Sequence, residues 1–365
     1  MTNSKIDDSL DLQRSSETPG APKLIEVLPQ HHLDEARLLP WLQKHVPDFG
    51  ELRALRQFQG GQSNPTYLIE GNNRSCVLRK RPPGVLLPSA HAVGREFQVI
   101  QALANTRVPV PQAFALCEDP GVIGTSFYAM EFVPGRILTD LKLQQTAAAE
   151  RTSIYLELAQ TLAALHDIEW RDGVLSDFGK PQNYLARQVR RWSKQFAASG
   201  IDSEDMTKLT AWVEAHIPLS DIEGEGCTLV HGDYRLGNII YDYASSRLLA
   251  VLDWELATIG NPLADLSYNC LAWRIPVELN GLQGHDDPTI PKEEDYLAAY
   301  CVAAGRRNLP QFEFYIAFSL FRLVAILAGV YRRAKDGNTA DASGLDAGRR
   351  LKFIARIGCD TAFRA

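Results

Sequence analysis

The sequence predicts an α+β protein of two parts, a small mixed-β N-lobe and a larger, mainly helical C-lobe. Short strand-like runs separated by turn residues occupy residues 51–133, whereas helical periodicity dominates after Gly135. The length of 365 residues suits two lobes or one large domain. We therefore expect a disordered leader over residues 1–30, an N-lobe over 31–134 and a C-lobe over 135–365.

Composition excludes several classes of protein and partner. Apolar residues make up 45% of the chain and charged residues 22%, which is typical of globular proteins. The formal net charge of −6 provides no basic field that would attract nucleic acid or anionic lipid, so we expect neither partner. The six cysteines lie far apart, and the first residues lack the apolar run of a secretory signal. These features predict a cytoplasmic protein.

The elements of the N-lobe follow from alternation and turn residues. Three strands, one helix and two further strands are expected in this order: 51–58, 66–70, 75–81, 91–104, 112–117 and 126–133. The helix is identified by Val93, Phe97, Ile100 and Leu103, which fall on one helical face.

The C-lobe is predicted from long helical stripes interrupted by one β segment at residues 227–256. The helices are expected at 151–168, 183–198, 203–215, 292–304 and 311–335. Within the last of these, Phe314–Tyr331 has a single charge and is barely long enough to span a bilayer. Because Arg322 near its middle would cost ~3 kcal/mol in a membrane, we favour a buried core helix and keep a membrane span as the alternative.

A predicted hairpin brings two oxygen donors together. Apolar runs at 239–243 and 247–252 flank a short serine-containing turn. If the hairpin is symmetric about that turn, Asn238 and Asp253 lie directly opposite each other, with Cβ atoms about 5 Å apart. An amide and a carboxylate at the open end of a hairpin are suited to sharing one Mg²⁺.

A second carboxylate precedes this hairpin. Asp233 lies five residues before Asn238, on the loop that enters the same end, where it is free to face a hydroxyl nucleophile. Taken singly, an HGD triplet is usually a polar turn, and Asp253 after a strand suits a helix N-cap. The joint spacing of these residues favours a chemical role.

The motif resembles the catalytic half of a kinase. The pattern HGDxxxxN from His231 to Asn238, followed by Asp253 in LDW and by GNPLADL, is similar to the aminoglycoside phosphotransferase (APH) and choline-kinase-like family. Within this family the likeness is greatest to the phosphotransferase-like domain that precedes an acyl-CoA dehydrogenase in some proteins, through VLRKRPPG and DWELATIGNPLADL. It covers about residues 35–360. The resemblance implies a bilobal protein-kinase-like fold, with a nucleotide-binding N-lobe and a C-lobe that holds the catalytic loop and acceptor pocket.

The resemblance also implies catalytic and metal-binding roles. Asp233 would accept or orient the proton of the substrate hydroxyl, and Asn238 and Asp253 would hold the Mg²⁺ that bridges the nucleotide phosphates. Arg235 would be a second catalytic residue, with its positively charged guanidinium facing the transferred phosphoryl group.

Two neighbouring residues are given structural roles by the same resemblance. Asp265 in the ADL triplet would bind the backbone of the catalytic loop. His231 would organise that loop rather than carry a proton, because phosphoryl transfer depends more on positioning and charge stabilisation than on a strong base.

The strand at 75–81 offers two candidate cations for the nucleotide phosphates. Because neighbouring residues alternate across a strand, Arg79 and Lys80 point to opposite faces. The resemblance places Arg79 where most kinases have a lysine, with Glu96 on the following helix as its ion-pair partner. An arginine can hold phosphate bidentately. Lys80 stays an alternative, and an exposed salt bridge is the plainer explanation for either.

The rest of the expected nucleotide site lies on a turn and a strand end. Four turn residues occupy the position of a phosphate-covering loop, although an ordinary hairpin turn explains them equally well: Gly60, Gly61, Gln62 and Ser63. The resemblance makes the Glu131 carbonyl and the Val133 amide the hinge that binds adenine, with Met130 behind it.

We expect an ATP-dependent phosphotransferase, a small-molecule kinase that moves the γ-phosphoryl group of ATP or GTP to a hydroxyl. The short segment between Asp253 and Asp265 leaves no room for a peptide-binding platform. The likeness suggests a hydroxyacyl-CoA or related hydroxy acid as acceptor and a functional link to an acyl-CoA dehydrogenase. The acidic run at 286–295 would instead suit an aminoglycoside-like polycation, or simply start a helix. The alternative function is a catalytically weak, nucleotide-binding pseudokinase that acts as a regulator or scaffold.

Overall fold

The computed structural model describes residues 20–59, 64–82, 93–335 and 343–364. The chain forms two compact units, one of Met1–Glu157 with Arg235–Leu256 and the other of Leu158–Tyr234 with Ala257–Ala365. The expected division was instead a single cut at residue 135. The chain thus leaves the first unit within a helix, returns to it at residue 235, and leaves it again after residue 256.

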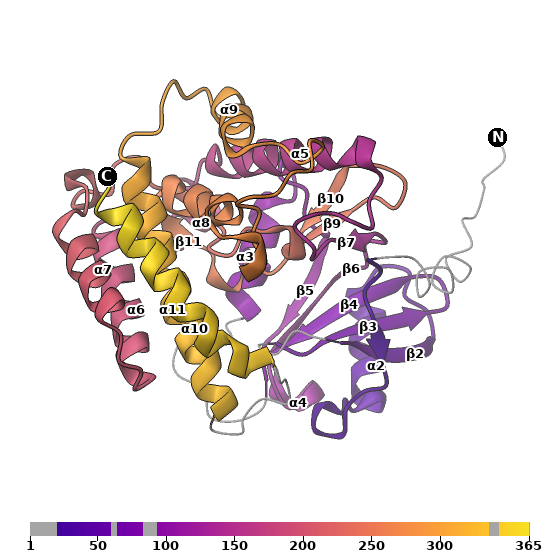
Figure 1. Ribbon diagram of the computed structural model, residues 1–365. Coiled ribbons are helices and arrows are strands. Elements are labelled where there is room, and N and C mark those ends of the chain that lie inside the picture. Colours follow the sequence, from indigo (N-terminus) through magenta and orange to yellow (C-terminus); the bar gives the residue numbers. More distant parts are fainter. Residues whose placement is uncertain (1–19, 60–63, 83–92, 336–342, 365) are drawn as a thin grey trace. The chain divides into compact units, whose positions relative to one another are not determined.

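A six-stranded antiparallel sheet forms the centre of unit 1 (Figure 1). Its strands are β1 (Leu24–Ile25), β2 (Leu52–Phe58), β3 (Thr66–Gly71), β4 (Ser75–Lys80), β5 (Ala113–Cys117) and β6 (Phe127–Glu131), in the order β1-β2-β3-β4-β6-β5. The five strands from β2 to β6 lie where alternation predicted them. β1 was not expected, because Leu24 and Ile25 fall in the segment interpreted as a disordered leader. They pair with Phe58 and Gln57 at the edge of the sheet.

Among the described residues, the α-helices that accompany this sheet are α2 (Glu35–His45), α3 (Val93–Leu103) and the single turn α4 (Pro120–Ile123). All four apolar residues that predicted α3 are buried, as the 3.6-residue spacing requires. The same helix buries Glu96, which is unusual for a carboxylate and is explained by its partners in the site below. On α2, Leu38 and Leu42 join a hydrophobic core that includes Tyr67 and Leu78 of the sheet.

A second, smaller sheet explains why residues 235–256 belong to unit 1. It contains β7 (Arg136–Ile137), β9 (Ile239–Tyr241) and β10 (Leu248–Val251), with β9 in the middle. Gly135 lets β7 approach β9, because a Cβ atom there would lie 2.3 Å from Ile240 Cγ2.

Unit 2 is mainly helical. The unit boundary falls within α5 (Ala148–His166), and the further helices are α6 (Tyr184–Ala198), α7 (Glu204–Ala215), α8 (Pro262–Arg274), α9 (Glu293–Ala303), α10 (Phe312–Lys335) and α11 (Ser343–Ala362). A two-stranded sheet pairs β8 (Thr228–Val230) with β11 (Thr258–Gly260). Short 3₁₀ helices lie at Gly173–Leu175, Leu219–Asp221 and Val277–Leu279 in this unit, and at Pro29–His31, Leu236–Asn238 and Trp254–Leu256 in unit 1.

Helix α10 has the length and composition of a membrane span, but it packs as a core helix. Of its most apolar window, 72% is buried within the protein. It contacts α6, α7, α8 and α11 (Figure 1). Arg322 is buried on this helix, with its guanidinium over the rings of Tyr268 and Trp192 at 4.4 and 5.3 Å. These contacts favour the core-helix interpretation of the sequence.

Candidate functional site

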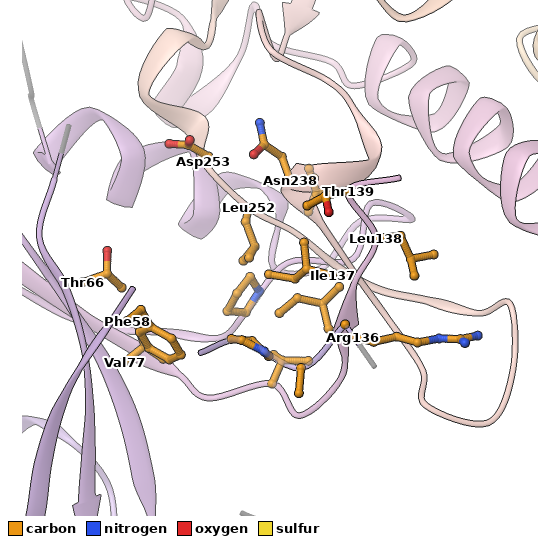
Figure 2. Close-up of a pocket in the computed structure, with 18 of the residues that line it drawn as sticks. Phe58, Thr66, Val77, Arg136, Ile137, Leu138, Thr139, Asn238, Leu252 and Asp253 are labelled. Carbon is orange, nitrogen blue, oxygen red and sulfur yellow. The ribbon is translucent and has the colours of Figure 1, made fainter. Parts of the chain in front are cut away.

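Unit 1 contains a cavity of about 560 Å³ (Figure 2). Its walls combine apolar side chains of both sheets with a polar group at one end. The lining includes six residues named from the sequence: Arg79, Met130, Glu131, Val133, Asn238 and Asp253. A mostly apolar hollow with a few converging polar groups is the usual form of a small-molecule site.

The hairpin that carries Asn238 and Asp253 differs from its expected register by one residue. Val251 pairs with Ile239, and the Leu252 amide donates a hydrogen bond to the Asn238 carbonyl at 2.8 Å. Asn238 is therefore opposite Leu252, and the predicted direct pairing with Asp253 is wrong. The cause is the turn, which is centred one residue earlier than expected: Tyr241 pairs with Leu248, and the Asp242 amide donates to the Arg247 carbonyl. An irregularity between Leu248 and Ala250 then adds a residue to one strand and removes half of this offset.

Asp253 nevertheless reaches the cavity, by way of its backbone conformation. Its φ angle is +67°, in the left-handed region that few residues other than glycine adopt. Asp tolerates this region better than most residues, and such conformations concentrate at functional sites. Figure 2 shows the Asn238 and Asp253 side chains at the same end of the cavity.

Arg79 joins Asp253 to the buried Glu96. Its Nη2 atom lies 2.6 Å from Asp253 Oδ1, and its Nε atom lies 2.9 Å from Glu96 Oε2. Burial alone would lower the pKa of Arg79, but the carboxylates of Glu96 and Asp253 outweigh it and keep the pKa above its usual value. The guanidinium is thus charged and fixed by two carboxylates.

Glu96 is held by two further donors that the sequence analysis did not identify. The Asn64 amide donates to Glu96 Oε1 at 2.7 Å, and the Tyr128 hydroxyl donates to Oε2 at 3.1 Å. Burial raises the pKa of the Glu96 carboxyl to about 7, and Arg79 opposes that rise. Alternation offered a signal for Tyr128, since it lies two residues before Met130 and both line the cavity.

Lys80 does not line the cavity, so the structure does not support it as the alternative cation for the nucleotide phosphates. Its ammonium donates to the His31 carbonyl at 3.2 Å and lies 5.5 Å from the centre of the Tyr67 ring. Burial lowers the pKa of this amine. Strand alternation places it on the face of β4 opposite Arg79, so Arg79 is the cation of this strand that faces the cavity.

The expected hinge and phosphate-covering loop have different outcomes. Glu131, Val133 and Met130 all line the cavity at the end of β6. Their hydrogen bonding to a purine stays a prediction. The loop residues lie outside the described part of the chain: Gly60, Gly61, Gln62 and Ser63.

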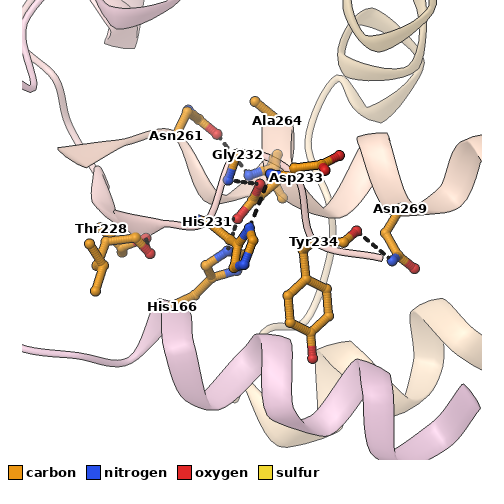
Figure 3. A network of polar contacts seen from close by, with 12 residues as sticks. His166, Thr228, His231, Gly232, Asp233, Tyr234, Asn261, Ala264 and Asn269 are labelled. Carbon is orange, nitrogen blue, oxygen red and sulfur yellow. Dashed lines mark hydrogen bonds and ion pairs between the residues drawn. The ribbon is translucent and has the colours of Figure 1, made fainter. Parts of the chain in front are cut away.

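The loop that carries Asp233 belongs to unit 2 and is held by Asp265 (Figure 3). The Asp265 carboxylate accepts hydrogen bonds from the backbone amides of His231 at 2.6 Å and Gly232 at 2.8 Å. The Asp233 amide donates to His231 Nδ1 at 3.1 Å. Asp265 thus binds the loop backbone, as expected, and the His231 ring accepts a bond that organises the loop.

Two residues behind Asp265 extend this network, and the sequence analysis did not name them. His166 Nε2 lies 3.6 Å from Asp265 Oδ2, and His166 Nδ1 lies 2.7 Å from the Tyr300 hydroxyl. Burial would raise the pKa of the Asp265 carboxyl, but His166 and the His231 amide hold it below its usual value. Burial also lowers the pKa of His166. The catalytic-loop backbone is therefore fixed by a buried, ionised carboxylate.

Arg235 does not line the cavity of unit 1. It is exposed, and its guanidinium lies over Gly237, where a Cβ atom would be 2.7 Å from Arg235 Nη1. Its carbonyl accepts a hydrogen bond from the Asn238 amide at 2.9 Å. The predicted catalytic role of Arg235 stays a prediction.

The donor set at the polar end of the cavity fits Mg²⁺ only in part. Asn238 and Asp253 supply an amide oxygen and a carboxylate, which are hard ligands. Among the described residues no group of three or more His, Cys, Asp or Glu side chains could hold a metal. Mg²⁺ in such sites commonly binds one or two protein carboxylates and completes its shell with phosphates and water. These residues therefore fit an ion that arrives with a phosphate ligand.

Comparison with curated proteins identifies relatives that are longer than this chain. Acyl-CoA dehydrogenase family member 10 of Mus musculus is 43% identical over 314 residues, which are 84% of this chain and 29% of the relative. Family member 11 of the same species is 39% identical over 352 residues, 94% of this chain and 45% of the relative. The chain thus spans less than half the length of these relatives. They confirm the likeness to a domain associated with acyl-CoA dehydrogenases.

Solved structures confirm the kinase-like α+β fold. An inferred aminoglycoside phosphotransferase of Ralstonia eutropha JMP134 is 41% identical, with a TM-score of 0.82, over 92% of this chain and 99% of that one. A spectinomycin phosphotransferase in complex with ADP and spectinomycin shares the fold at 13% identity and a TM-score of 0.58, over 89% and 98%. Residues 54–315 match the model of the phosphotransferase enzyme family, APH. Because this match covers most of the sequence, the chain belongs to that family.

Proposed function

We propose that this protein transfers the γ-phosphoryl group of ATP or GTP to a hydroxyl group of a small molecule. The observation that carries the proposal is the cavity of unit 1, where Arg79 contacts Asp253 and Asn238 lies at the same end as Asp253 (Figure 2). A cation beside two oxygen donors suits a metal–triphosphate, whereas the remaining apolar wall suits a nucleoside.

The nucleotide assignment is supported by chemistry on both sides of the cavity. Met130, Glu131 and Val133 offer an apolar wall and strand-end backbone groups of the kind that bind a purine. Related structures are described with either ADP or GDP, a spectinomycin phosphotransferase with the first and an aminoglycoside 2′-phosphotransferase with the second. ATP and GTP are therefore both proposed as donors.

Asn238 and Asp253 would hold Mg²⁺ at the phosphates. When bound, the ion neutralises charge that develops on the phosphate oxygens during transfer. In this structure one carboxylate oxygen of Asp253 accepts a hydrogen bond from Arg79. Binding of a metal–nucleotide would therefore rearrange that contact.

The transfer itself requires the loop of unit 2. The acceptor hydroxyl oxygen would form a bond to the γ-phosphorus atom while the bond from that atom to the β–γ bridging oxygen breaks, releasing a nucleoside diphosphate. Asp233 would take up the hydroxyl proton or orient it. The backbone of this loop is held by Asp265, which provides the positioning that phosphoryl transfer depends on.

For the acceptor we propose a hydroxyacyl-CoA or a related hydroxy acid. The names of the mouse relatives support this choice, because they link the domain to acyl-CoA dehydrogenases. A functional link to such a dehydrogenase, in the cytoplasm, is part of the proposal. An aminoglycoside is the second acceptor class, supported by the description of the Ralstonia eutropha structure.

A regulatory pseudokinase is the alternative function. Two observations favour it: Arg79 stands in place of the usual lysine, and its guanidinium contacts the carboxylate that would bind the metal. The alternative predicts nucleotide binding without turnover.

A phosphorylation screen tests the proposal. The full chain is incubated with γ-labelled ATP or GTP, Mg²⁺ and a panel of hydroxyacyl-CoAs, free hydroxy acids and aminoglycosides, and label transfer is measured. The Asp233→Asn variant serves as the blank, because the amide cannot accept the hydroxyl proton. Asp202→Asn, an exposed change in the same unit, is the matched control.

The outcomes separate the two functions. Label transfer that is lost in Asp233→Asn and kept in Asp202→Asn supports the kinase. Tight nucleotide binding without transfer to any acceptor supports the pseudokinase. Transfer that persists in Asp233→Asn would remove this residue from the mechanism.

A further inference from the structure

The cavity of unit 1 has a wall that comes from the N-terminal part of the chain. Four consecutive residues, Gly20 to Lys23, line it together with Phe58 of the large sheet, the following Gln59, and Ile137 of the small sheet. This N-terminal segment lies outside the family match, which begins at residue 54. Its place in the cavity is therefore a feature of this chain that the family match does not cover.

The N-terminal segment is fixed at both ends by backbone hydrogen bonds. At one end the Ile137 amide donates to the Gly20 carbonyl at 2.8 Å, and at the other the Gln59 amide donates to the Lys23 carbonyl at 2.8 Å. The chain then continues directly into β1, which pairs with β2. The segment thus bridges β7 and the end of β2, with one backbone hydrogen bond to each side.

The first of these anchor points depends on glycine. Gly20 has a φ angle of +84°, and a Cβ atom there would lie 3.2 Å from both Arg136 Cβ and the Ile137 carbonyl oxygen. A larger residue would be strained in this conformation and would push the segment away from β7. Gly20 therefore allows the N-terminal segment to lie against β7.

We propose that residues Gly20–Lys23 form part of the nucleotide site and contact the nucleoside portion of the bound nucleotide. Ala21 and Pro22 add apolar surface to the wall, whereas the cation and oxygen donors for phosphate lie with Arg79, Asn238 and Asp253. A wall of this kind excludes water from the base and ribose and raises affinity without touching the phosphates. This inference rests on the proposed function, since it assigns a further part of the same site.

The test compares two glycines of unit 1 that have the same φ angle. Gly124 also has a φ angle of +84°, but a Cβ atom there would meet nothing within 4 Å. Gly20→Val and Gly124→Val therefore add the same side chain and comparable backbone strain, and only the first displaces the N-terminal segment. We expect the Kd of Mg·ADP, measured by calorimetry on the full chain, to rise about tenfold in Gly20→Val and to stay unchanged in Gly124→Val.

A second ligand separates the nucleoside from the phosphates. Mg·tripolyphosphate carries the phosphates alone, so its Kd should be the same in both variants and in the original protein. If Gly20→Val does not fold, Ala21→Trp replaces it, because the added ring occupies the wall without requiring a glycine. Ala104→Trp, at an exposed position of the same unit, is then the control.

The outcomes distinguish this inference from the proposed function. An unchanged Kd for Mg·ADP in the folded Gly20→Val or Ala21→Trp variant overturns the role of the N-terminal segment and leaves the kinase proposal standing. Failure of the original protein to bind any nucleotide overturns both. An equal loss of Mg·ADP and Mg·tripolyphosphate affinity would also contradict the assignment to the nucleoside.

Discussion

Arg79 Nη2 lies 2.6 Å from Asp253 Oδ1, so the cation expected at the nucleotide phosphates contacts the carboxylate expected at the metal. The same guanidinium contacts Glu96, which is only 1% exposed. A single side chain thus neutralises one buried carboxylate and one at the cavity surface. The stability of unit 1 and the proposed binding of nucleotide therefore depend on the same residue.

Replacing Arg79 by methionine should destabilise the protein strongly. Glu96 would be left buried without its cation, and breaking a buried ion pair by removing one partner costs about 3–5 kcal/mol. The double variant Arg79→Met with Glu96→Gln should recover much of this loss, because no uncompensated charge remains. Urea unfolding of both variants measures the effect.

The matched control is Arg37→Met on α2. The ion pair of Arg37 with Asp34 is exposed, with side chains 68% and 49% accessible, so its loss should be far smaller. Equal losses for the exposed and buried pairs, or no recovery in the double variant, would show that Arg79 does not compensate Glu96.

Asp253→Asn should remove the part of nucleotide affinity that depends on Mg²⁺. Asparagine tolerates the left-handed backbone conformation at this position, so the change removes charge with little added strain. We expect Mg²⁺ to tighten ATP binding at least about tenfold in the original protein, or about 1.4 kcal/mol, and to have little effect in the variant. Titration of ATP with Mg²⁺ and with a chelator measures this difference.

The matched control for that titration is Asp140→Asn. Asp140 also lines the cavity, but its carboxylate accepts hydrogen bonds from the Lys142 and Gln144 amides. Its loss should leave the Mg²⁺ effect intact. If Mg²⁺ tightened binding equally in Asp253→Asn, Asp253 would not be a metal ligand.

The buried Glu96 should make stability depend on pH near neutrality. Its carboxyl has a pKa of about 7 in the folded protein, above its ordinary value of 4.5, because burial disfavours the charged form. A group with a raised folded pKa contributes its full stability below the unfolded pKa and loses that contribution as pH rises through the folded value. The charged and polar groups that face it are Asn64, Arg79, Tyr128, Asp253 and Glu255.

Glu96→Gln should remove this dependence. As the pH rises from about 4.5 to above about 7, the unfolding free energy of the original protein should fall by up to about 3 kcal/mol relative to that of the variant. Urea unfolding of both proteins at about pH 5 and about pH 8 gives the difference. A difference that is the same at both values would mean that Glu96 titrates alike in the folded and unfolded chain.

Local periodicity predicted the elements and the faces that carry the site. Alternation in the strand at 75–81 separated Arg79 from Lys80, and the helical stripe identified α3 and its buried apolar face. These faces depend only on the geometry of each element. The pairing of Arg79 with Glu96 came instead from the family resemblance, and the two side chains lie 2.9 Å apart in the structure.

Long-range details were not accessible in the same way. The register of the hairpin differs from the expected one because its turn lies one residue earlier, and a regular apolar run gives no sign of that position or of the irregularity near Leu249. The strand Leu24–Ile25 is only two residues long and exists because it pairs with β2, far along the chain. The positive φ angle that directs Asp253 into the cavity is likewise set by its surroundings.

The Asp265 carboxylate should set the rate of catalysis without affecting nucleotide binding. It is buried in unit 2 and accepts the His231 and Gly232 amides. Asp265→Asn replaces one carboxylate oxygen by an NH₂ group, which then faces the backbone amide of His231 or Gly232. That buried backbone amide loses its acceptor, which costs about 2 kcal/mol. We expect kcat to fall at least tenfold while the KM for ATP changes little, because the variant displaces the loop that carries Asp233 and leaves the cavity of unit 1 unaltered.

Tyr300→Phe is the graded control for this network. It removes the hydroxyl that bonds His166 and leaves the two backbone bonds of Asp265 in place. Its kcat should therefore lie between those of the original protein and Asp265→Asn. Steady-state kinetics with ATP varied, together with thermal unfolding of each variant, separates the two effects. If Asp265→Asn raised the KM for ATP and left kcat unchanged, its carboxylate would not position the catalytic loop.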